Sequence, residues 1–581
     1  MNKLISISGS ILIIVAIFMF IGFSDKSNTI NTPVNKNGSE VTRLKPVAGL
    51  INSKKSRYDF PPVNLFALNS KAKTNKTIDN FVTKATFLKI DNQSLSGFLK
   101  SPLENITFRI PDSKNGFMEL ELTRVNFLSD DFKLSSKNSS TEIKQTESYT
   151  PGLFYRGIIK DDNNSVASVS IFENDVMGII SNKTGNYVIG KIEDKDNPEY
   201  GNFIFYNDGD ILTPNPFKCS LDGNDSKYIK PVKTNHNDNS FNTDAAQLPV
   251  KVYFEADYKL YTDKGSTTQN VYNYVTGFYN STVTLYANEN IAFLLSEIMV
   301  WTQTDPYISY GTSTQVLMQF GTKTKDDFQG TLAHLLSTRT DNLGGIAWIR
   351  VLCQPYDQTD NSGRFAFSNI DNTYQGYPTF SWTVMCVTHE MGHNLGSMHT
   401  HSCWWPTSPG VIGAIDSCYT AEGNCFFGTR AAVGTIMSYC HLTAPIGGIN
   451  LYLGFGPMPG DTIRLRYGQA KCLTRELNSS EQPVAFVLGQ NFPNPYNPGT
   501  NIQFSVPKNA NVTLKVFDIN GREIANLIGG NLYTTGIYSY YFNAGNYSIP
   551  SGIYLYQLTA TDPSSGGKVI FSEVKKMILI K

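Results

Sequence analysis

Histidine is concentrated in one short stretch of this 581-residue chain. Four of its seven histidines, His389, His393, His399 and His401, fall within 13 residues. His389 and His393 are four residues apart, so on a helix they lie on one face, one turn from each other. Gly396 allows a left-handed turn that ends the helix, after which His399 can return to the same place. The spacing therefore constrains residues 381–395 to a helix that is followed by a tight reversal.

These residue types match a site for a single zinc ion. Three neutral imidazoles, those of His389, His393 and His399, leave one position of a tetrahedral zinc open for a water, whose pKa falls to about 7 when it is bound. Glu390, beside the first ligand, can take the proton of that water and pass it to a leaving amine. The pattern predicts one catalytic Zn²⁺ and hydrolysis of a polarised carbonyl, with peptide bonds as the usual target. A structural Ca²⁺ is compatible with the chain, but no motif specifies one.

The alternative is a helix whose histidines are hydrogen-bonded or exposed and bind no metal. A bare His-Glu-x-x-His often arises by chance, but Gly396 and His399 at the seventh and tenth positions after His389 make an accidental match about a thousand times rarer. We expect His401 to lie at the surface or to support a ligand rather than to bind the metal.

The motif resembles that of the metzincin metalloproteases, in which a distant Met-turn follows the third histidine. Residues 434–439, Gly-Thr-Ile-Met-Ser-Tyr, resemble that turn. The resemblance implies that Met437 forms an apolar floor beneath the metal, and the alternative is an ordinary core methionine. In the astacin and serralysin branches a tyrosine at the position of Tyr439 reaches the zinc or the oxyanion of the transition state, and the alternative is a core tyrosine whose hydroxyl is bonded locally. The resemblance also implies that an edge strand containing Gly345, Ile346 and Ala347 runs antiparallel to the substrate and binds its backbone. Residues 441–459 would then form the wall of the main specificity pocket.

Within the metzincins, the run after His393 and the many cysteines resemble the adamalysin or reprolysin group. That group usually has Asp after the third histidine, where this chain has Thr400, so a pappalysin-like enzyme is the alternative. In metzincin zymogens a cysteine of the propeptide commonly binds the zinc in place of water. Cys219, the one cysteine before residue 248, is the candidate for this switch, and the alternative is a structural thiol.

Cysteine usage and charge indicate an exported protein that does not bind nucleic acid. The 49 basic residues balance the 49 acidic ones, and no basic stripe is present. Seven of the eight cysteines lie between residues 353 and 472 without a C-x-x-C pair, which favours disulfides with at least one free thiol. We expect two disulfides among Cys403, Cys418, Cys425 and Cys440, a third between Cys353 and Cys472, and a free Cys386.

Composition divides the chain into several units. Residues 1–24 read as a signal peptide, although their apolar run is also long enough to stay as an anchor. Short alternating strands predict a β-rich prodomain with its linker over 25–247. Alternating strands and helices predict an α/β catalytic domain over 248–476, with a mixed twisted sheet and the histidine-bearing helix. A polar linker, 477–486, precedes a region at 487–581, where strands at 501–506, 512–517, 538–542, 552–558 and 569–580 predict an Ig-like antiparallel sandwich.

Four ordered motifs in the last segment resemble the C-terminal sorting domain of type IX secretion. They lie at residues 491–498, 514–523, 550–556 and 575–581. The resemblance implies that type IX secretion machinery is a partner. It also implies that the chain crosses the periplasm to the outer-membrane surface of a diderm bacterium, or beyond it.

Together these features predict a secreted zinc metalloendopeptidase that acts on proteins or peptides and is made as a zymogen. The alternative from another functional class is a surface adhesin with a vestigial protease fold. Three intact histidines and an intact Glu390 argue against that alternative.

Overall fold

The structure is a computed structural model. It describes residues 44–69, 81–112, 116–138, 144–193, 202–212, 215, 219, 248–340, 343–370, 373–374, 377–408, 411–425, 431, 433–442, 448–473, 485–491, 494–496, 498–533, 536–563 and 567–580. The predicted signal peptide and most of both predicted linkers lie outside these residues. None of the described helices is long and apolar enough to cross a membrane.

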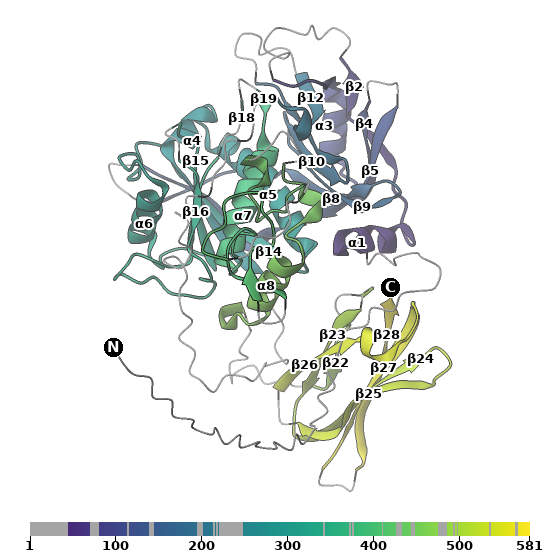
Figure 1. Cartoon of the computed structure of the whole chain (residues 1–581). Coiled ribbons are helices and arrows are strands. Elements are labelled where there is room, and N and C mark those ends of the chain that lie inside the picture. The colour runs from purple at the N-terminus through teal and green to yellow at the C-terminus, as the bar shows by residue number, and fades with distance from the viewer. Residues whose placement is uncertain are drawn as a thin grey trace, which may run out of the picture. The chain divides into compact units, whose positions relative to one another are not determined.

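The N-terminal region is built on a ten-stranded sheet in the order β1-β4-β5-β8-β9-β10-β11-β12-β3-β2 (Figure 1). Neighbouring strands are antiparallel except β1 and β4, and the buried apolar side chains of these strands form most of a core of their own. The strands are β1 (Pro62–Asn64), β2 (Phe66–Leu68), β3 (Thr86–Ile90), β4 (Asn105–Pro111), β5 (Phe117–Val125), β8 (Leu153–Ile159), β9 (Asp162–Ile171), β10 (Val176–Asn182), β11 (Gly185–Lys191) and β12 (Asn202–Asn207), and the helices are α1 (Pro46–Lys55) and α3 (Asn92–Lys100).

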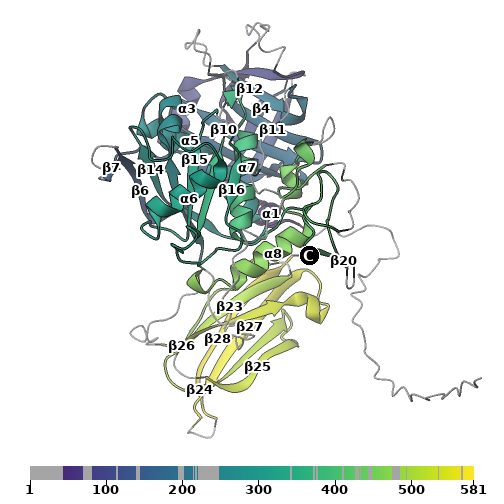
Figure 2. The same cartoon turned by 60° about the vertical axis from the view of Figure 1, so that its left-hand side comes forward.

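The central region is a mixed seven-stranded sheet in the order β16-β17-β15-β13-β14-β6-β7 (Figure 2). Strands β13, β14 and β15 at its centre run parallel and are mostly apolar, because packed elements cover both faces. The strands are β6 (Leu128–Lys137), β7 (Gln145–Glu147), β13 (Val250–Ala256), β14 (Phe293–Trp301), β15 (Leu332–Ser337), β16 (Gly345–Ala347) and β17 (Phe365–Asn369). The helices are α4 (Tyr258–Asp263), α5 (Thr268–Ala287), α6 (Ser313–Thr324), α7 (Phe380–Asn394) and α8 (Pro457–Gly468).

Two short hairpins lie beyond this sheet. They are formed by β18 (Thr373–Tyr374) with β19 (Tyr377–Pro378), and by β20 (Trp405–Ser408) with β21 (Val411–Gly413).

Strands β6 and β7 come from the segment before residue 247, which the sequence analysis expects to be a prodomain. β6 nevertheless pairs in parallel with β14, from Leu295 to Trp301, and extends the central sheet at its edge. Alternation along a strand predicts that the strand exists but does not identify its partner. The edge strand that contains Gly345 ends at Ala347, after which the chain turns and Arg350 N–H donates to the carbonyl of His393.

The C-terminal region consists of two antiparallel sheets, β22-β23-β26 and β25-β24-β27-β28, whose apolar residues form one core. The strands are β22 (Val487–Leu488), β23 (Gly499–Val506), β24 (Ala510–Asp518), β25 (Glu523–Tyr533), β26 (Gly536–Asn543), β27 (Gly552–Thr561) and β28 (Val569–Leu579). Only β22 and β25 are absent from the predicted strands. β25 contains Gly529 and Gly530, which interrupt the alternating pattern.

Three disulfides lie in the central region and join Cys353 to Cys472, Cys403 to Cys425 and Cys418 to Cys440. The predicted Cys353–Cys472 bond and the pairing within the group of four are confirmed. Cys219 and Cys386 are outside these bonds and buried, so the prediction of a free Cys386 is also confirmed.

Candidate metal centre and active site

Helix α7 carries the first part of the site. All its residues are buried, and it places His389 and His393 on one face with Glu390 beside them. The helix ends at Asn394, where Gly396 takes a φ of 97°, a left-handed conformation that favours glycine. The Ser397 N–H donates to the carbonyl of Gly392 and closes the reversal. The predicted helix and its turn therefore return the chain to the same face.

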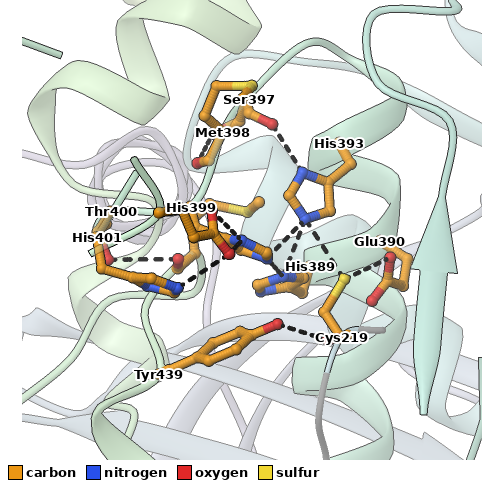
Figure 3. A network of polar contacts seen from close by, with 12 residues as sticks. Cys219, His389, Glu390, His393, Ser397, Met398, His399, Thr400, His401 and Tyr439 are labelled. Atoms are coloured by element: carbon orange, nitrogen blue, oxygen red, sulfur yellow. Dashed lines mark hydrogen bonds and ion pairs between the residues drawn. The ribbon is translucent and has the colours of Figure 1, made fainter. Parts of the chain in front are cut away.

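The three histidines converge through their Nε2 atoms (Figure 3). Each pair of Nε2 atoms among His389, His393 and His399 is 3.1 Å apart. Each Nδ1 lies 2.8–2.9 Å from an oxygen acceptor, namely the Ile436 carbonyl, the Ser397 carbonyl and the Glu422 carboxylate. Because these acceptors favour a hydrogen on each Nδ1, the three Nε2 lone pairs face one another.

This arrangement fits a zinc ion. Two nitrogens bound to one tetrahedral zinc are about 3.3 Å apart, close to the 3.1 Å separations found. Three mutually facing lone pairs repel one another unless a cation lies among them. Burial lowers the pKa of all three imidazoles below its usual range, so they are neutral ligands at physiological pH.

Cys219 lies next to the point where the three Nε2 atoms converge. Its Sγ is 3.7 Å from His393 Nε2 and 3.5 Å from Glu390 Oε2. A sulfur and a nitrogen on one tetrahedral zinc are about 3.6 Å apart, so Cys219 has the geometry of a fourth ligand. The ligand atoms of Cys219 and the three histidines all lie within 4.8 Å of one another, and all four residues are buried.

Two further contacts hold the backbone of Cys219. It forms a parallel bridge with Gly345 of β16, and its carbonyl accepts a hydrogen bond of 2.9 Å from the Tyr439 hydroxyl. In Figure 3 the Tyr439 hydroxyl points toward Cys219. Burial, followed by the charges of Cys219 and Glu390, raises the pKa of Tyr439, so its hydroxyl stays protonated.

Glu390 is the one carboxylate on the active face of α7. Its Oε2 faces Cys219, while its Oε1 is buried without a hydrogen-bond partner. Burial raises the pKa of Glu390 well above its usual range, and the Cys219 thiol opposes that effect only in part. A buried carboxyl oxygen with no partner, next to three converging imidazoles, is suited to proton transfer.

Met437 packs behind the helix. It is fully buried, and a Cβ at Gly392 would come within 2.8 Å of its Sδ. The Met437 carbonyl accepts the N–H of Thr400, which fixes the segment that carries His399. Glycine at 392 thus allows the methionine to approach α7 closely.

Glu422 is the residue that sequence reasoning missed. Its Oε1 and Oε2 lie 2.9 and 3.1 Å from His399 Nδ1, and its Oε1 is 3.3 Å from His401 Nε2. The only sequence signal was its position between Cys418 and Cys425, whose disulfides tie this loop to the site. Burial acts to raise the pKa of Glu422, but the two histidines outweigh it and the pKa is lowered, so the carboxylate is charged.

His401 does not join the converging nitrogens. Its ring stacks on that of His399, with centroids 4.9 Å apart and planes 7° from parallel, and the side chain is buried rather than exposed. It therefore supports a ligand from outside the metal site, one of the two roles that the sequence analysis allowed.

β16, the predicted substrate strand, is at one end of the sheet order. It pairs antiparallel with β17 through Gly345, Ile346 and Ala347. On its other side the structure places Cys219. Within the described part of the chain, every predicted site residue thus lies at the converging histidines or in the strand and segment beside them.

Comparison with known families agrees with this chemistry. Residues 247–444, which include the converging histidines, match metallo-peptidase family M12. The chain contains a metallopeptidase domain of the reprolysin type. Residues 490–572 match a secretion system C-terminal sorting domain, which indicates export by type IX secretion to the cell surface or beyond it. The chain is therefore a secreted or cell-surface protein with an M12 metallopeptidase domain.

Three solved structures are similar to parts of the chain. Metalloproteinase-II from Bacteroides fragilis is 11% identical, with 58% of this chain and 88% of that one covered and a TM-score of 0.32. OgpA from Akkermansia muciniphila, in complex with an O-glycopeptide substrate, is 10% identical over 57% and 93% of the two chains, with a TM-score of 0.18. Latent PorU from Porphyromonas gingivalis is 21% identical over 16% and 9%, with a TM-score of 0.13.

Proposed function

We propose that this M12 peptidase is a zinc-dependent endopeptidase that hydrolyses proteins or peptides and is made as a zymogen. The observation that carries the proposal is the convergence of three Nε2 atoms, 3.1 Å apart, beside the unpartnered Oε1 of Glu390. His389, His393 and His399 would hold the ion. A bound Zn²⁺ supplies a Lewis acid and lowers the pKa of a water.

In this proposal the chain's own groups orient the substrate and move protons. The N–H and C=O groups of β16 bind an extended peptide antiparallel to the strand, at Gly345, Ile346 and Ala347. Glu390 accepts a proton from the attacking water and delivers it to the leaving amine. Tyr439, protonated and directed at the same point, donates a hydrogen bond to the oxygen that gains negative charge.

Latency in the proposal comes from Cys219. Its thiolate would occupy the fourth position near His393 and Glu390, and so exclude water from both. Its backbone pairs with Gly345 in parallel, opposite to the direction proposed for a substrate, so the segment blocks the edge strand without presenting a bond for cleavage. Cleavage between Cys219 and Leu248 would then permit the segment to leave.

The proposed domains follow from these roles. They are a signal peptide at 1–24, a prodomain and linker at 25–247, a metzincin catalytic domain at 248–476, a linker at 477–486 and an Ig-like sorting domain at 487–581.

The test is a pair of variants in the full chain, Glu390→Ala and the exposed control Glu173→Ala, each cut between Cys219 and Leu248. We expect Glu390→Ala to retain one zinc per chain by elemental analysis and to lose hydrolysis of a denatured protein. The control should keep both. The proposal would be contradicted if Glu390→Ala hydrolysed the protein at the full rate. It would also be contradicted if the cut wild-type chain held zinc but hydrolysed nothing, and that result would favour a surface adhesin with a vestigial protease fold.

A further inference from the structure

Helix α5 is buried on every side from Tyr274 to Tyr286. Fifteen of its residues are buried, including the polar Asn280, Ser281 and Thr282. A helix on the surface of a domain normally keeps one polar face in water. α5 instead packs on the central sheet through Phe278 and Tyr279, whose rings meet Phe254 of β13. Its remaining faces must therefore be covered by another part of the chain.

The N-terminal sheet provides this cover. Asn280 Nδ2 donates to the carbonyls of Tyr155 and Val169, at 3.1 and 3.2 Å, and Ser281 lies 2.7 Å from Ser168, oxygen to oxygen. These partners belong to β8 and β9. Asn280 therefore binds the backbone of both strands within the buried contact.

Aromatic rings from before residue 150 complete the contact. Tyr272 of α5 packs against Tyr149 and Phe132, with ring centroids 4.9 and 5.9 Å apart, and Tyr279 meets Phe127 edge-on at 5.6 Å. Both tyrosines are fully buried. Removal of residues before 219 would expose these rings and leave β14 as an open parallel edge, because β6 would be lost with them.

Hydrogen bonds also connect the N-terminal sheet to the metal centre. Asn186 of β11 donates to the carbonyl of Ile449 and accepts from the N–H of Leu451. The intervening Asn450 donates its N–H to the carbonyl of Gly434, two residues before Ile436, whose carbonyl lies 2.8 Å from His389 Nδ1. The N-terminal sheet thus braces the turn that positions the first ligand.

We infer that the N-terminal sheet, together with β6 and β7, is a permanent partner of the catalytic region and stays bound to it after the chain is cut. This inference rests on the proposed cleavage between Cys219 and Leu248. The mature enzyme is then a non-covalent pair of chains. Activation displaces the segment that carries Cys219 and leaves the β domain in place.

The experiment uses the full chain with a site-specific protease sequence inserted between Cys219 and Leu248. After cleavage we expect both pieces to elute together on size exclusion, with the summed mass in native mass spectrometry, and to separate only in denaturant. Two pieces that elute apart in buffer, with a soluble monomeric catalytic piece, would overturn the inference. The readout is independent of hydrolysis, so an inactive but associated pair would contradict the proposed function alone.

Two matched variants test the α5 contact. Gly277 lies in α5, where a Cβ would come within 2.4 Å of Met177 Sδ in β10, whereas a Cβ at Gly97 in α3 meets nothing within 4 Å. We expect Gly277→Leu to raise the dissociation constant of the cut pair roughly tenfold or more, and Gly97→Leu to leave it unchanged. If the cut pairs of both variants had the same dissociation constant as the cut wild type, the proposed contact of α5 would be wrong. If Gly277→Leu fails to fold, the cut wild-type chain still decides the inference.

Discussion

Replacement of Glu422 by alanine tests how the third histidine is held. The carboxylate of Glu422 lies against His399 Nδ1, with its two oxygens at 2.9 and 3.1 Å, and the Glu422 side chain is 9% exposed. The neighbouring His401 Nε2 also faces it, at 3.3 Å. Without Glu422 the imidazole of His399 can rotate or exchange tautomers, and its Nε2 is no longer fixed toward the other two.

The size of the effect follows from the kind of bond that is lost. A hydrogen bond to a charged group contributes about 1.5–3 kcal/mol when it is shielded from water. Every 1.4 kcal/mol is roughly a factor of ten in affinity, so Glu422→Ala should weaken zinc binding about 10- to 100-fold. Glu422→Gln keeps an acceptor oxygen but loses the charge, and we expect a smaller loss.

The assay is zinc competition with a chromophoric chelator, using the cut full chain. It measures affinity without any dependence on hydrolysis. Far-ultraviolet circular dichroism of the same samples shows that the variants remain folded. Unchanged zinc affinity in Glu422→Ala would refute the view that this carboxylate positions His399.

Three further perturbations have defined outcomes. Cys219→Ser should make the uncut chain hydrolyse a denatured protein at least about tenfold faster than the uncut wild type, because a hydroxyl is a far weaker zinc ligand than a thiolate. A variant as inactive as the uncut wild type would argue against latency through this residue. Gly396→Ala should lower stability by about 1–2 kcal/mol, since an alanine at a φ of 97° is strained, while Gly468→Ala in the open last turn of α8 should not; equal melting temperatures would contradict the strain. Burial and the charge of Asp305 raise the pKa of Asp257 to about 7 from 3.8, so the folded state becomes less favourable as the pH rises between those values. Asp257→Asn keeps the oxygen that accepts the Leu260 N–H but carries no charge. Its melting temperature should equal that of wild type near pH 4, exceed it increasingly up to about pH 7, and exceed it by a constant amount above that pH. A difference that does not vary with pH would contradict the shifted pKa.

Local spacing explains how much of the site could be predicted. His389 and His393 are one helical turn apart, and Gly396 permits the reversal that brings back His399, so all three ligands follow from positions within eleven residues. Glu422 could not be found in this way, because it lies in a loop without periodicity and reaches His399 only through the path of the chain between two disulfides.

The same distinction applies to the fold. Many strands and the long helices were predictable from their apolar patterns, but β6 is mostly polar and carries little alternation. Its pairing with β14, which lies more than 150 residues further along the chain, depends on long-range packing that no local pattern encodes. The burial of α5 on all sides is visible in its sequence as an absence of charged residues from Thr268 to Ala287, but the sheet that covers it is not.

Zinc K-edge X-ray absorption of the full chain, before and after cleavage between Cys219 and Leu248, tests the central claim most directly. We predict one zinc with three nitrogen ligands and one sulfur ligand at about 2.3 Å before cleavage. After cleavage, an oxygen or nitrogen ligand should replace the sulfur, and hydrolysis of a denatured protein should appear. A zinc site that never contains sulfur, or that keeps its sulfur in a fully active enzyme, would contradict the account.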